Sequence, residues 1–271
     1  ALNYTPVEGF IHEDGRVVGV KIRDSLTGEL LEARGTVLIN ATGVWVDRVR
    51  ALDMHRTENL RPSKGIHLVV PRHRIRQDAT VAFTVPNDHR MIFAIPWGEV
   101  TLIGTTDTFY EGSPDQVRSE PADVRYLLDA TNHIFPNARL TEADIVSTYA
   151  GVRPLVAPKD ETDSASSVSR EHQIFEDPSG LLSIAGGKLT TYRRMAISLV
   201  DMAEKRLPDS RRCGIGPCIT EQPLAGSIID VETEVKRLEG AGLTPQAARH
   251  LVEAYGPDAM KVLELLSLIH I

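Results

Sequence analysis

The eight residues from Gly186 to Arg193, Gly-Gly-Lys-Leu-Thr-Thr-Tyr-Arg, carry the clearest chemical signal in the sequence. They follow an apolar strand predicted at Leu181–Ala185 and open a helix predicted from about Leu189 to Arg206. Two glycines at such a junction leave backbone N–H groups open to close approach at the positive end of a helix dipole. The junction therefore favours negative charge, either a phosphate or the N1/C2 carbonyl region of a reduced flavin ring. An ordinary strand–turn–helix, in which glycine only permits the turn, explains the same residues.

Three basic side chains are candidates for holding an anion. Lys188 lies at the mouth of the glycine turn, where a mobile ammonium suits an anionic oxygen. Arg153, in a Gly-Val-Arg-Pro string at the end of a predicted strand, carries a planar guanidinium that can bind a carboxylate or phosphate through two hydrogen bonds. Arg170, after the polar stretch 158–167, is a weaker second candidate. An exposed lysine and a structural salt bridge are the competing interpretations.

His67 is the candidate general base. It ends the string Lys-Gly-Ile-His that begins at Lys64, and an imidazole that titrates near neutral pH can take a proton from a substrate hydroxyl. A hydrogen-bonded structural histidine at the start of a strand is the alternative.

The first part of the chain predicts strands that end in small residues. Strands are expected at Val17–Asp24 and around Leu30, joined by a turn, and a buried strand is expected at Thr36–Ile39. That third strand runs into Asn-Ala-Thr-Gly at 40–43, and ligands of open α/β sheets sit at the carboxyl ends of strands. The small residues suit close passage of a ligand backbone, with Trp45 covering an apolar face. Tight packing of a strand against a helix explains them equally well.

The middle of the chain predicts an antiparallel sheet. Short apolar runs recur with turns between them, and Gly98-Glu99 has the pattern of a hairpin turn. A helix at Pro121–Phe135 and a strand at Ile145–Val156 complete this block. The apolar runs are Ile66–Val70, Thr80–Val85, Met91–Trp97 and Val100–Gly104.

The last part of the chain predicts a return to mixed structure and then helices. Beyond the polar stretch come strands at Ser169–Phe175 and Leu181–Ala185, then the glycine junction and its helix. A linker at Pro208–Pro223 leads to three short helices, of which the middle one has Thr244 as its cap and Pro245 at its first position. The predicted helices are Val231–Leu238, Pro245–Tyr255 and Ala259–Leu268.

Composition places the chain among ordinary globular proteins. Its 271 residues are 42% hydrophobic and 25% charged, which predicts one or two domains. The formal net charge of -7 excludes a general nucleic-acid binder, because phosphate neutralisation needs a basic surface. Eight Lys or Arg between Arg48 and Arg76 form a basic island that can attract an anionic substrate or lipid head groups, or be a solvated surface.

Cellular location follows from three absences in the sequence. It contains no run of about 18 apolar residues and no charged-then-apolar leader, so neither a membrane span nor a secretory signal is predicted. Cys213 and Cys218 form a C-x4-C pair with no further Cys or His cluster beside it, which predicts plain thiols rather than a metal site. We therefore expect a cytoplasmic protein.

Taken together, the strings resemble one family over nearly the whole chain, the FAD-dependent glycerol-3-phosphate dehydrogenases. These belong to the wider group of flavin oxidoreductases that includes D-amino-acid oxidase. The order and spacing of the strings match as well as their composition. The matching strings are Asn40–Trp45, Lys64–His67, Ile95–Trp97, Ile103–Asp107, Tyr149–Leu155 and Gly186–Arg193.

This resemblance implies an architecture of mixed α/β and α+β type. A FAD-binding domain at 1–64 and 158–207 is interrupted by an antiparallel substrate domain at 65–157, and a helical C-terminal domain follows at 208–271. The family begins with a strand, a GxGxxG turn and a helix that grip the FAD pyrophosphate, and no GxGxxG occurs here. We therefore expect the chain to correspond to the middle and late part of a longer enzyme, with a truncated helical domain.

The resemblance also implies residue roles. Arg153 and Lys188 would hold the substrate phosphate with Arg170 assisting, and His67 would lie by the reacting carbon. Val7 would lie near the adenine of FAD. Two further groups would contact the cofactor: Gly186, Gly187, Lys188, Leu189 and Thr190 at the flavin, and Ala41, Thr42, Gly43 and Trp45 beside the dinucleotide.

The activity implied is oxidation of the C2 alcohol of sn-glycerol 3-phosphate to dihydroxyacetone phosphate, with a hydride passed to flavin N5. The electrons would continue to a quinone or another acceptor. The family further suggests peripheral contact with the inner face of a membrane, and a homodimer is one candidate assembly. Two alternatives stay open: an amino-acid or amine oxidase relative in which Arg153 holds a carboxylate, and an inactive fragment that binds no FAD alone.

Overall fold

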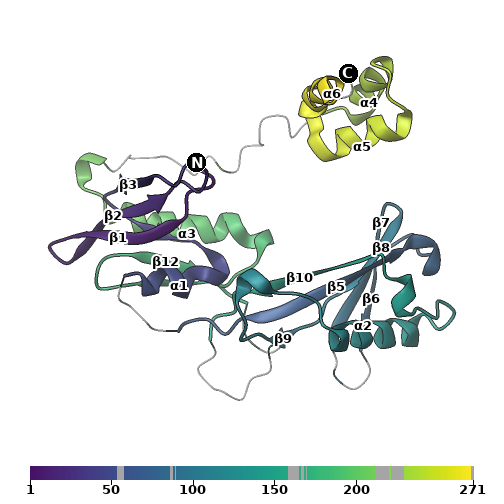
Figure 1. The fold of residues 1–271 in the computed structure, drawn as a ribbon, viewed down its shortest axis with the longest axis horizontal. Coiled ribbons are helices and arrows are strands. Elements are labelled where there is room, and N and C mark those ends of the chain that lie inside the picture. Colours follow the sequence, from purple (N-terminus) through teal and green to yellow (C-terminus); the bar gives the residue numbers. More distant parts are fainter. Residues whose placement is uncertain are drawn as a thin grey trace. The chain divides into compact units, whose positions relative to one another are not determined.

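The chain forms two compact units, which are described separately. A computed structural model describes residues 1–53, 58–85, 88, 90–157, 165, 168, 170–211, 220 and 229–269 (Figure 1). The first unit is Ala1–Arg212 and the second is Cys213–Ile271. Cys213, Cys218, Arg56 and most of the polar stretch at 158–167 lie outside the described residues.

The first unit begins with a three-stranded antiparallel sheet of β1 (Val7–Glu13), β2 (Arg16–Arg23) and β3 (Leu30–Arg34). The hairpin of β2 and β3 was predicted, whereas β1 was missed. Asp14 and Gly15 join β1 to β2 with φ angles of 50° and 75°. Asp-Gly is a strong hairpin signal because both turn positions need positive φ. The missed strand therefore had a readable signal in its turn.

A second three-stranded sheet joins distant parts of the sequence. It contains β4 (Ile39–Asn40), β11 (Gln173–Glu176) and β12 (Leu182–Ala185), and β12 pairs with β4 in parallel. The buried strand predicted at Thr36–Ile39 enters the ladder only at its last residue. Because parallel strands end at the same sheet edge, the small residues after β4 and the glycines after β12 come to one edge.

Helices flank this sheet. α1 (Val46–Ala51) follows a short 3₁₀ turn, η1 (Gly43–Trp45). The helix predicted from Leu189 begins as a second 3₁₀ turn, η5 (Leu189–Thr191), and becomes α-helical only in α3 (Tyr192–Glu204). Leu199 of α3 packs with Leu182 and Ile184 of β12 in a small apolar core.

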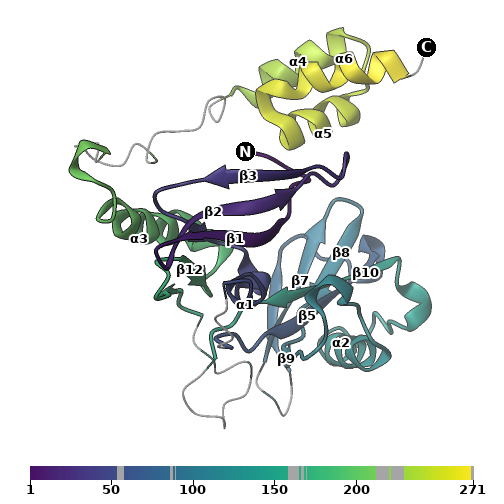
Figure 2. The ribbon, with the colours of Figure 1, turned by 60° about the vertical axis from the view of Figure 1, so that its left-hand side comes forward.

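The largest sheet has six strands. It is antiparallel, as predicted for the middle of the chain (Figure 2). Its order is β10-β5-β8-β7-β6, with β9 also paired to β5. β10 ends three residues earlier than predicted because Pro154, which lacks an N–H, follows its last residue. The strands are β5 (Ser63–Pro71), β6 (Val81–Thr84), β7 (Met91–Trp97), β8 (Val100–Gly104), β9 (Thr108–Phe109) and β10 (Ser147–Arg153).

Helix α2 (Pro121–Ile134) covers one face of the six-stranded sheet. It begins with a capping box between Glu120 and Asp123 and with proline in its first turn. Its buried Leu127 joins fully buried sheet residues in the main core, among them Ile66, Leu68, Ile92 and Ile103. Lys64 anchors this helix, since its Nζ lies 2.8 Å from Glu120 and 2.7 Å from Asp123.

Strand β5 therefore divides its residues between two environments. Side chains alternate along a strand, so Lys64, Ile66 and Leu68 face α2 and the core. Ser63, Gly65 and His67 face the opposite side of the sheet. His67, the predicted site residue of this strand, lies on that second face.

The second unit is a three-helix assembly of α4 (Val231–Gly240), α5 (Pro245–Tyr255) and α6 (Ala259–Ile269). All three helices were predicted, and Thr244 caps α5 as expected by accepting a hydrogen bond from the Ala247 N–H. Val235, Leu238, Ala248, Leu251 and Val252 form its core.

Candidate functional site

The register between β5 and β10 brings the candidate arginine and histidine to the same sheet face. Arg153 lies opposite Ser63, Gly151 opposite Gly65, and Tyr149 opposite His67. Each pair is two residues from the next, so all these side chains point to the face away from α2.

Arg153 is held firmly at the end of β10. Its Nη1 lies 3.2 Å from Asp107 Oδ1, and its Nη2 donates to Thr105 Oγ1 at 3.1 Å. Both nitrogens also donate to the Thr106 carbonyl at 3.3 Å. A Cβ at Gly65 would lie 2.5 Å from Nη2, so the guanidinium passes directly over this glycine. Burial lowers the pKa of Arg153, which Asp107 opposes by favouring the charged form.

Asp107 links two of the predicted basic residues. Its other oxygen, Oδ2, lies 3.3 Å from Nη2 of Arg170, and its side chain is only 8% exposed. Sequence reasoning did not assign a role to Asp107, although the residue ends one of the family-like strings. An acid that bridges two arginines 46 and 63 residues away in sequence leaves no local spacing signal.

His67 lies beside this cluster. Its ring stacks on Tyr149 with centroids 4.7 Å apart and planes 9° apart, and it also lies over Gly104 of β8. Burial lowers the pKa of His67, and the positive charge of nearby Arg153 lowers it further. The imidazole is therefore neutral near pH 7, the state in which a ring nitrogen can accept a proton.

The glycine junction has the conformation that its sequence requires. Gly186 and Gly187 have φ angles of 77° and 76°. A Cβ at Gly186 would lie 2.6 Å from the Glu171 carbonyl, and one at Gly187 would lie 2.4 Å from Met195 Sδ. Both positions therefore need glycine. The turn that follows is open to solvent, with the Leu189 residue 88% exposed.

Lys188 and Arg170 border a common pocket. The pocket has a volume of about 300 Å³, and its other lining residues are Glu171, His172, Gly187, Thr191 and Arg194. Arg170 thus belongs both to this pocket and to the Asp107 pair. The pocket is lined by three basic residues, Arg170, Lys188 and Arg194, and by one acidic residue, Glu171.

Two residues predicted to contact the cofactor, Val7 and Thr42, line a separate apolar pocket, whereas Ala41, Gly43 and Trp45 do not line it. Val7 of β1 and Thr42 after β4 both border this space of about 320 Å³, together with Val37, Ile39 and Leu181. Gly43 has a φ of 62° and open space where a Cβ would stand. An apolar pocket beside a small-residue turn suits an adenine and its linker, so these residues fit part of a FAD molecule. Trp45 donates from Nε1 to Asp115 at 2.9 Å, and its side chain is partly exposed.

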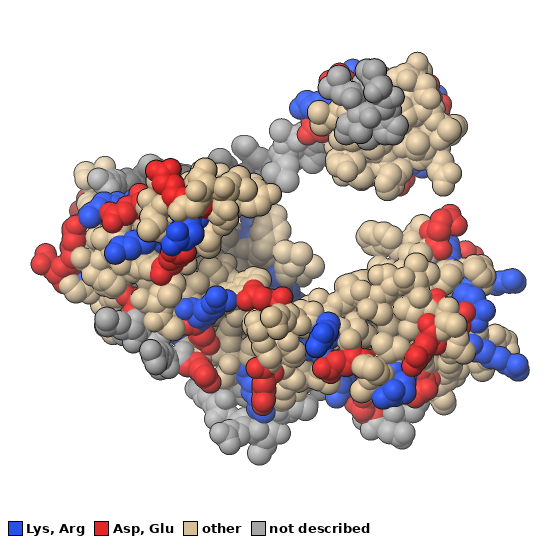
Figure 3. All heavy atoms as spheres, in the orientation of Figure 1, with Lys and Arg blue, Asp and Glu red and all other residues tan. Residues whose placement is uncertain are grey.

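Most of the basic island is engaged in ion pairs. Arg50 is buried against Asp177, and Lys64 is buried against Asp123. Figure 3 shows acidic and basic side chains interspersed on the visible face of the molecule. Further pairs join Arg48 to Asp115, Arg72 to Asp78 and Arg74 to Asp144.

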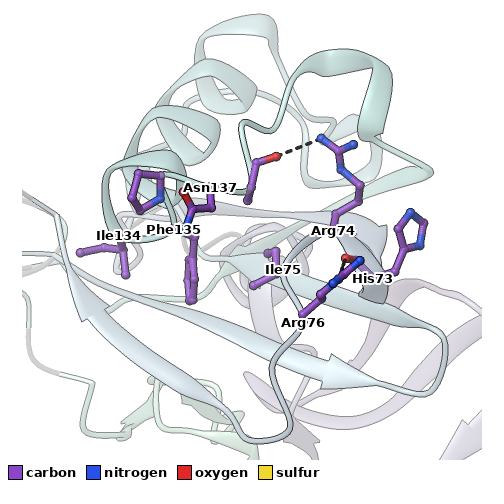
Figure 4. Close-up of a pocket in the computed structure, with 9 residues that line it drawn as sticks. His73, Arg74, Ile75, Arg76, Ile134, Phe135 and Asn137 are labelled. Carbon is purple, nitrogen blue, oxygen red and sulfur yellow. Dashed lines mark hydrogen bonds between the residues drawn. The ribbon is translucent and has the colours of Figure 1, made fainter.

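Another pocket of about 550 Å³ lies between the 3₁₀ turn η2 (Arg72–Arg74) and the end of α2 (Figure 4). It is lined by His73, Arg76 and Phe135 among others, and Arg74 donates to the Ala138 carbonyl at 3.0 Å. None of the residues predicted to bind substrate or cofactor lines this pocket.

Within the ranges that the structure describes, no group of three or more His, Cys, Asp or Glu side chains is arranged to hold a metal ion. Over the same ranges, no helix has both the length and the apolar character needed to cross a bilayer.

Known proteins match both the sequence and the fold. The aerobic glycerol-3-phosphate dehydrogenase of Staphylococcus haemolyticus is 38% identical over 272 residues, which cover 96% of this chain and 48% of that protein. The enzyme of the same name from Staphylococcus aureus strain USA300 is 39% identical, with 95% and 48% covered. The chain thus spans about half the length of these curated relatives.

Solved structures give the same result. The glycerol-3-phosphate dehydrogenase from Bacillus halodurans, complexed with FAD, superposes with a TM-score of 0.85 at 36% identity, covering 97% of this chain and 52% of that one. The L-α-glycerophosphate oxidase of Mycoplasma pneumoniae shares the fold at a TM-score of 0.53 and 19% identity, covering 75% and 50%. These matches confirm the resemblance stated from the sequence. The family profile described as FAD dependent oxidoreductase matches residues 1–193, and the chain belongs to that family.

Proposed function

We propose that this chain supplies the substrate-binding part of a flavoenzyme that oxidises sn-glycerol 3-phosphate at C2 to dihydroxyacetone phosphate. The observation that carries this proposal is the cluster of Arg153, Asp107 and Arg170 beside a neutral His67. The names of the similar proteins from Staphylococcus and Bacillus support the same substrate.

The balance of charge favours a phosphate over a carboxylate. The four basic side chains around the cluster and its pocket exceed the two carboxylates by two positive charges. A phosphate monoester carries nearly two negative charges, whereas an amino-acid carboxylate carries one and is satisfied by a single arginine. Because Arg153 is largely buried, its attraction to an anion is weakly screened.

His67 has the position and protonation state of a proton acceptor. With the phosphate held by Arg153, the C2 hydroxyl of a three-carbon substrate comes within reach of groups on the same sheet face, and fixed orientation lowers the barrier. The neutral imidazole then takes the hydroxyl proton. FAD, when bound, supplies the hydride acceptor.

The same proposal assigns domains along the chain. Residues 1–64 and 158–207 form the FAD-binding part, 65–157 the substrate-binding part and 208–271 a helical domain. This division is supported by β4 and β12, which come from the two flanking segments and pair with each other. The six-stranded sheet takes nearly all of its residues from the middle segment.

Flavin absorbance provides the test. The FAD-loaded protein is mixed without oxygen with sn-glycerol 3-phosphate, with glycerol or with a panel of amino acids. We expect sn-glycerol 3-phosphate to bleach the flavin band, glycerol to act far more weakly, and amino acids to have no effect. Bleaching by amino acids alone would establish the oxidase alternative instead. A protein that takes up no FAD under any condition would support the inactive-fragment alternative.

The location and electron acceptor are part of the proposal. We place the enzyme in the cytoplasm, in peripheral contact with the inner membrane face, where a quinone takes up the electrons. Sedimentation with anionic vesicles and reduction of a soluble quinone by the substrate-reduced enzyme test these two points. Rapid reoxidation by oxygen with no quinone reduction would show an oxidase instead.

A further inference from the structure

The ring of Tyr149 lies flat against the imidazole of His67. The two residues are direct partners across β10 and β5, and their rings are 4.7 Å apart and 9° from parallel. Cross-strand partners have Cβ atoms about 5 Å apart, a separation that allows such stacking. The contact is therefore fixed by the strand register.

The other neighbour of His67 leaves the ring little freedom. Gly104 of β8 pairs with His67 from the opposite side. A Cβ on Gly104 would lie 2.3 Å from Cδ2 of His67. The imidazole therefore occupies the space that the side chain of any other residue at position 104 would need. The ring is thus held between the Tyr149 ring and the Gly104 backbone.

The ring of Tyr149, rather than its hydroxyl, makes this contact. Among the described residues the hydroxyl has no hydrogen-bond partner, and burial raises its pKa, so the phenol stays neutral and is no proton acceptor. The Tyr149 residue is 47% exposed, unlike the core residues on the α2 side of the sheet. An aromatic residue that is half exposed and stacked on one histidine contributes little to the core.

We propose that Tyr149 is a positioning residue whose ring holds the imidazole of His67 in the orientation that accepts the substrate proton. This inference rests on the role proposed for His67 in glycerol 3-phosphate oxidation. The charged and titratable groups facing the imidazole are the Arg153 guanidinium and the Tyr149 phenol. Asp107 pairs with Arg153 and with Arg170. Tyr149 also shields the ring from water, which favours the neutral imidazole.

Two substitutions separate the ring from the hydroxyl. Tyr149→Phe retains the stacking ring, and Tyr149→Leu removes it. Trp97→Leu is the matched control, because Trp97 is an exposed aromatic residue of the same sheet, at the far end of β7. The first measurement is an NMR titration of the histidine Cε1–H signals in this chain, with His67 assigned by His67→Gln.

We expect Tyr149→Leu to abolish the ring-current shift of the His67 signal and to raise its pKa towards the ordinary value. Tyr149→Phe and Trp97→Leu should leave both unchanged. In the active enzyme, Tyr149→Leu should lower kcat about 10- to 100-fold with little change in KM, since a small misplacement of a catalytic group has an effect of this size. Tyr149→Phe should keep nearly full kcat.

Three results would overturn the inference. One is an unchanged His67 signal in Tyr149→Leu, and another is an equal loss of kcat in Tyr149→Phe, which would assign the effect to the hydroxyl. A third is an equal effect of Trp97→Leu. Full activity of His67→Gln would refute the proposed role of His67 itself, and the NMR titration still reports the stacking in that case.

Discussion

Replacing Gly65 by alanine places a methyl group where the Arg153 guanidinium now lies. The new Cβ would stand 2.5 Å from Nη2 and 2.7 Å from Nη1 of Arg153, and 2.6 Å from Oγ1 of Thr105. Carbon contacts need about 3.5 Å, so the guanidinium has to withdraw. Arg153 then loses the hydrogen bonds that hold it over the strand.

The size of the effect follows from those contacts. Arg153 donates to Thr105 and to the Thr106 carbonyl and pairs with Asp107, with three-quarters of its side chain buried. A hydrogen bond to a charged group contributes about 1.5–3 kcal/mol, and an overpacked methyl group costs about 1–3 kcal/mol. Alanine recovers about 0.4–1 kcal/mol by restricting the unfolded chain. We expect a net loss of about 2–5 kcal/mol in the free energy of unfolding.

Gly151→Ala is the matched control. Gly151 pairs directly with Gly65 across the two strands, and a Cβ there would meet no atom within 4 Å. This variant should equal the unsubstituted protein in stability or exceed it by about 0.4–1 kcal/mol. The KM for sn-glycerol 3-phosphate should rise in Gly65→Ala and stay unchanged in Gly151→Ala.

Urea unfolding followed by tryptophan fluorescence measures this difference. The chain has two tryptophans, Trp45 and Trp97, and both lie in the unit Ala1–Arg212, so the signal reports on the unit that holds the site. Equal free energies of unfolding and equal KM values for Gly65→Ala and Gly151→Ala would show that the Arg153 guanidinium does not lie over residue 65.

Three further predictions concern Arg153, Lys64 and His67. Arg153→Ala should lower kcat/KM for sn-glycerol 3-phosphate by an amount that corresponds to a loss of about 2–4 kcal/mol in transition-state stabilisation. The value for glycerol should hardly change. Unchanged kinetics would remove Arg153 from the site. Lys64→Met should destabilise the fold by about 3–5 kcal/mol in urea unfolding, because it leaves the buried Asp123 carboxylate without its lysine partner. Combining it with Asp123→Leu should restore much of this stability. A double variant whose loss equals the sum of the two single losses would contradict this account. The folded-state pKa of His67 lies below its ordinary value of 6.5, so the unfolded chain binds this proton first as pH falls. The His67 contribution to stability is therefore complete above about pH 6.5 and is lost as pH falls towards the folded value, and His67→Gln should remove that part of the pH slope.

Local signals in the sequence were sufficient for much of the secondary structure. Thr244 and Pro245 marked the start of α5, and Gly98-Glu99 marked the hairpin of β7 and β8. These signals act within a few residues, so no knowledge of packing is needed to interpret them. Asp14-Gly15 was an equally local signal, and β1 was missed because that turn was not used.

Sequence strings also predicted the identity of several candidate site residues. Arg153, His67 and Lys188 stood out through their neighbours, namely a strand end, a strand start and a glycine turn. The residues of the Lys64–His67 string lie on opposite faces of the sheet, since Lys64 anchors α2 on one face and His67 lies on the other. Alternation along a strand explains the division once the strand and its buried face are known.

The sequence by itself determined the family, the main elements and the basic residues that meet at the site, because these depend on residue type and short spacing. Only the tertiary structure decided that Asp107 lies between Arg153 and Arg170, that Tyr149 stacks on His67, and that two glycines make room for these side chains. Strand register and strand order bring together these residues, which are far apart in sequence, and neither can be predicted from local composition.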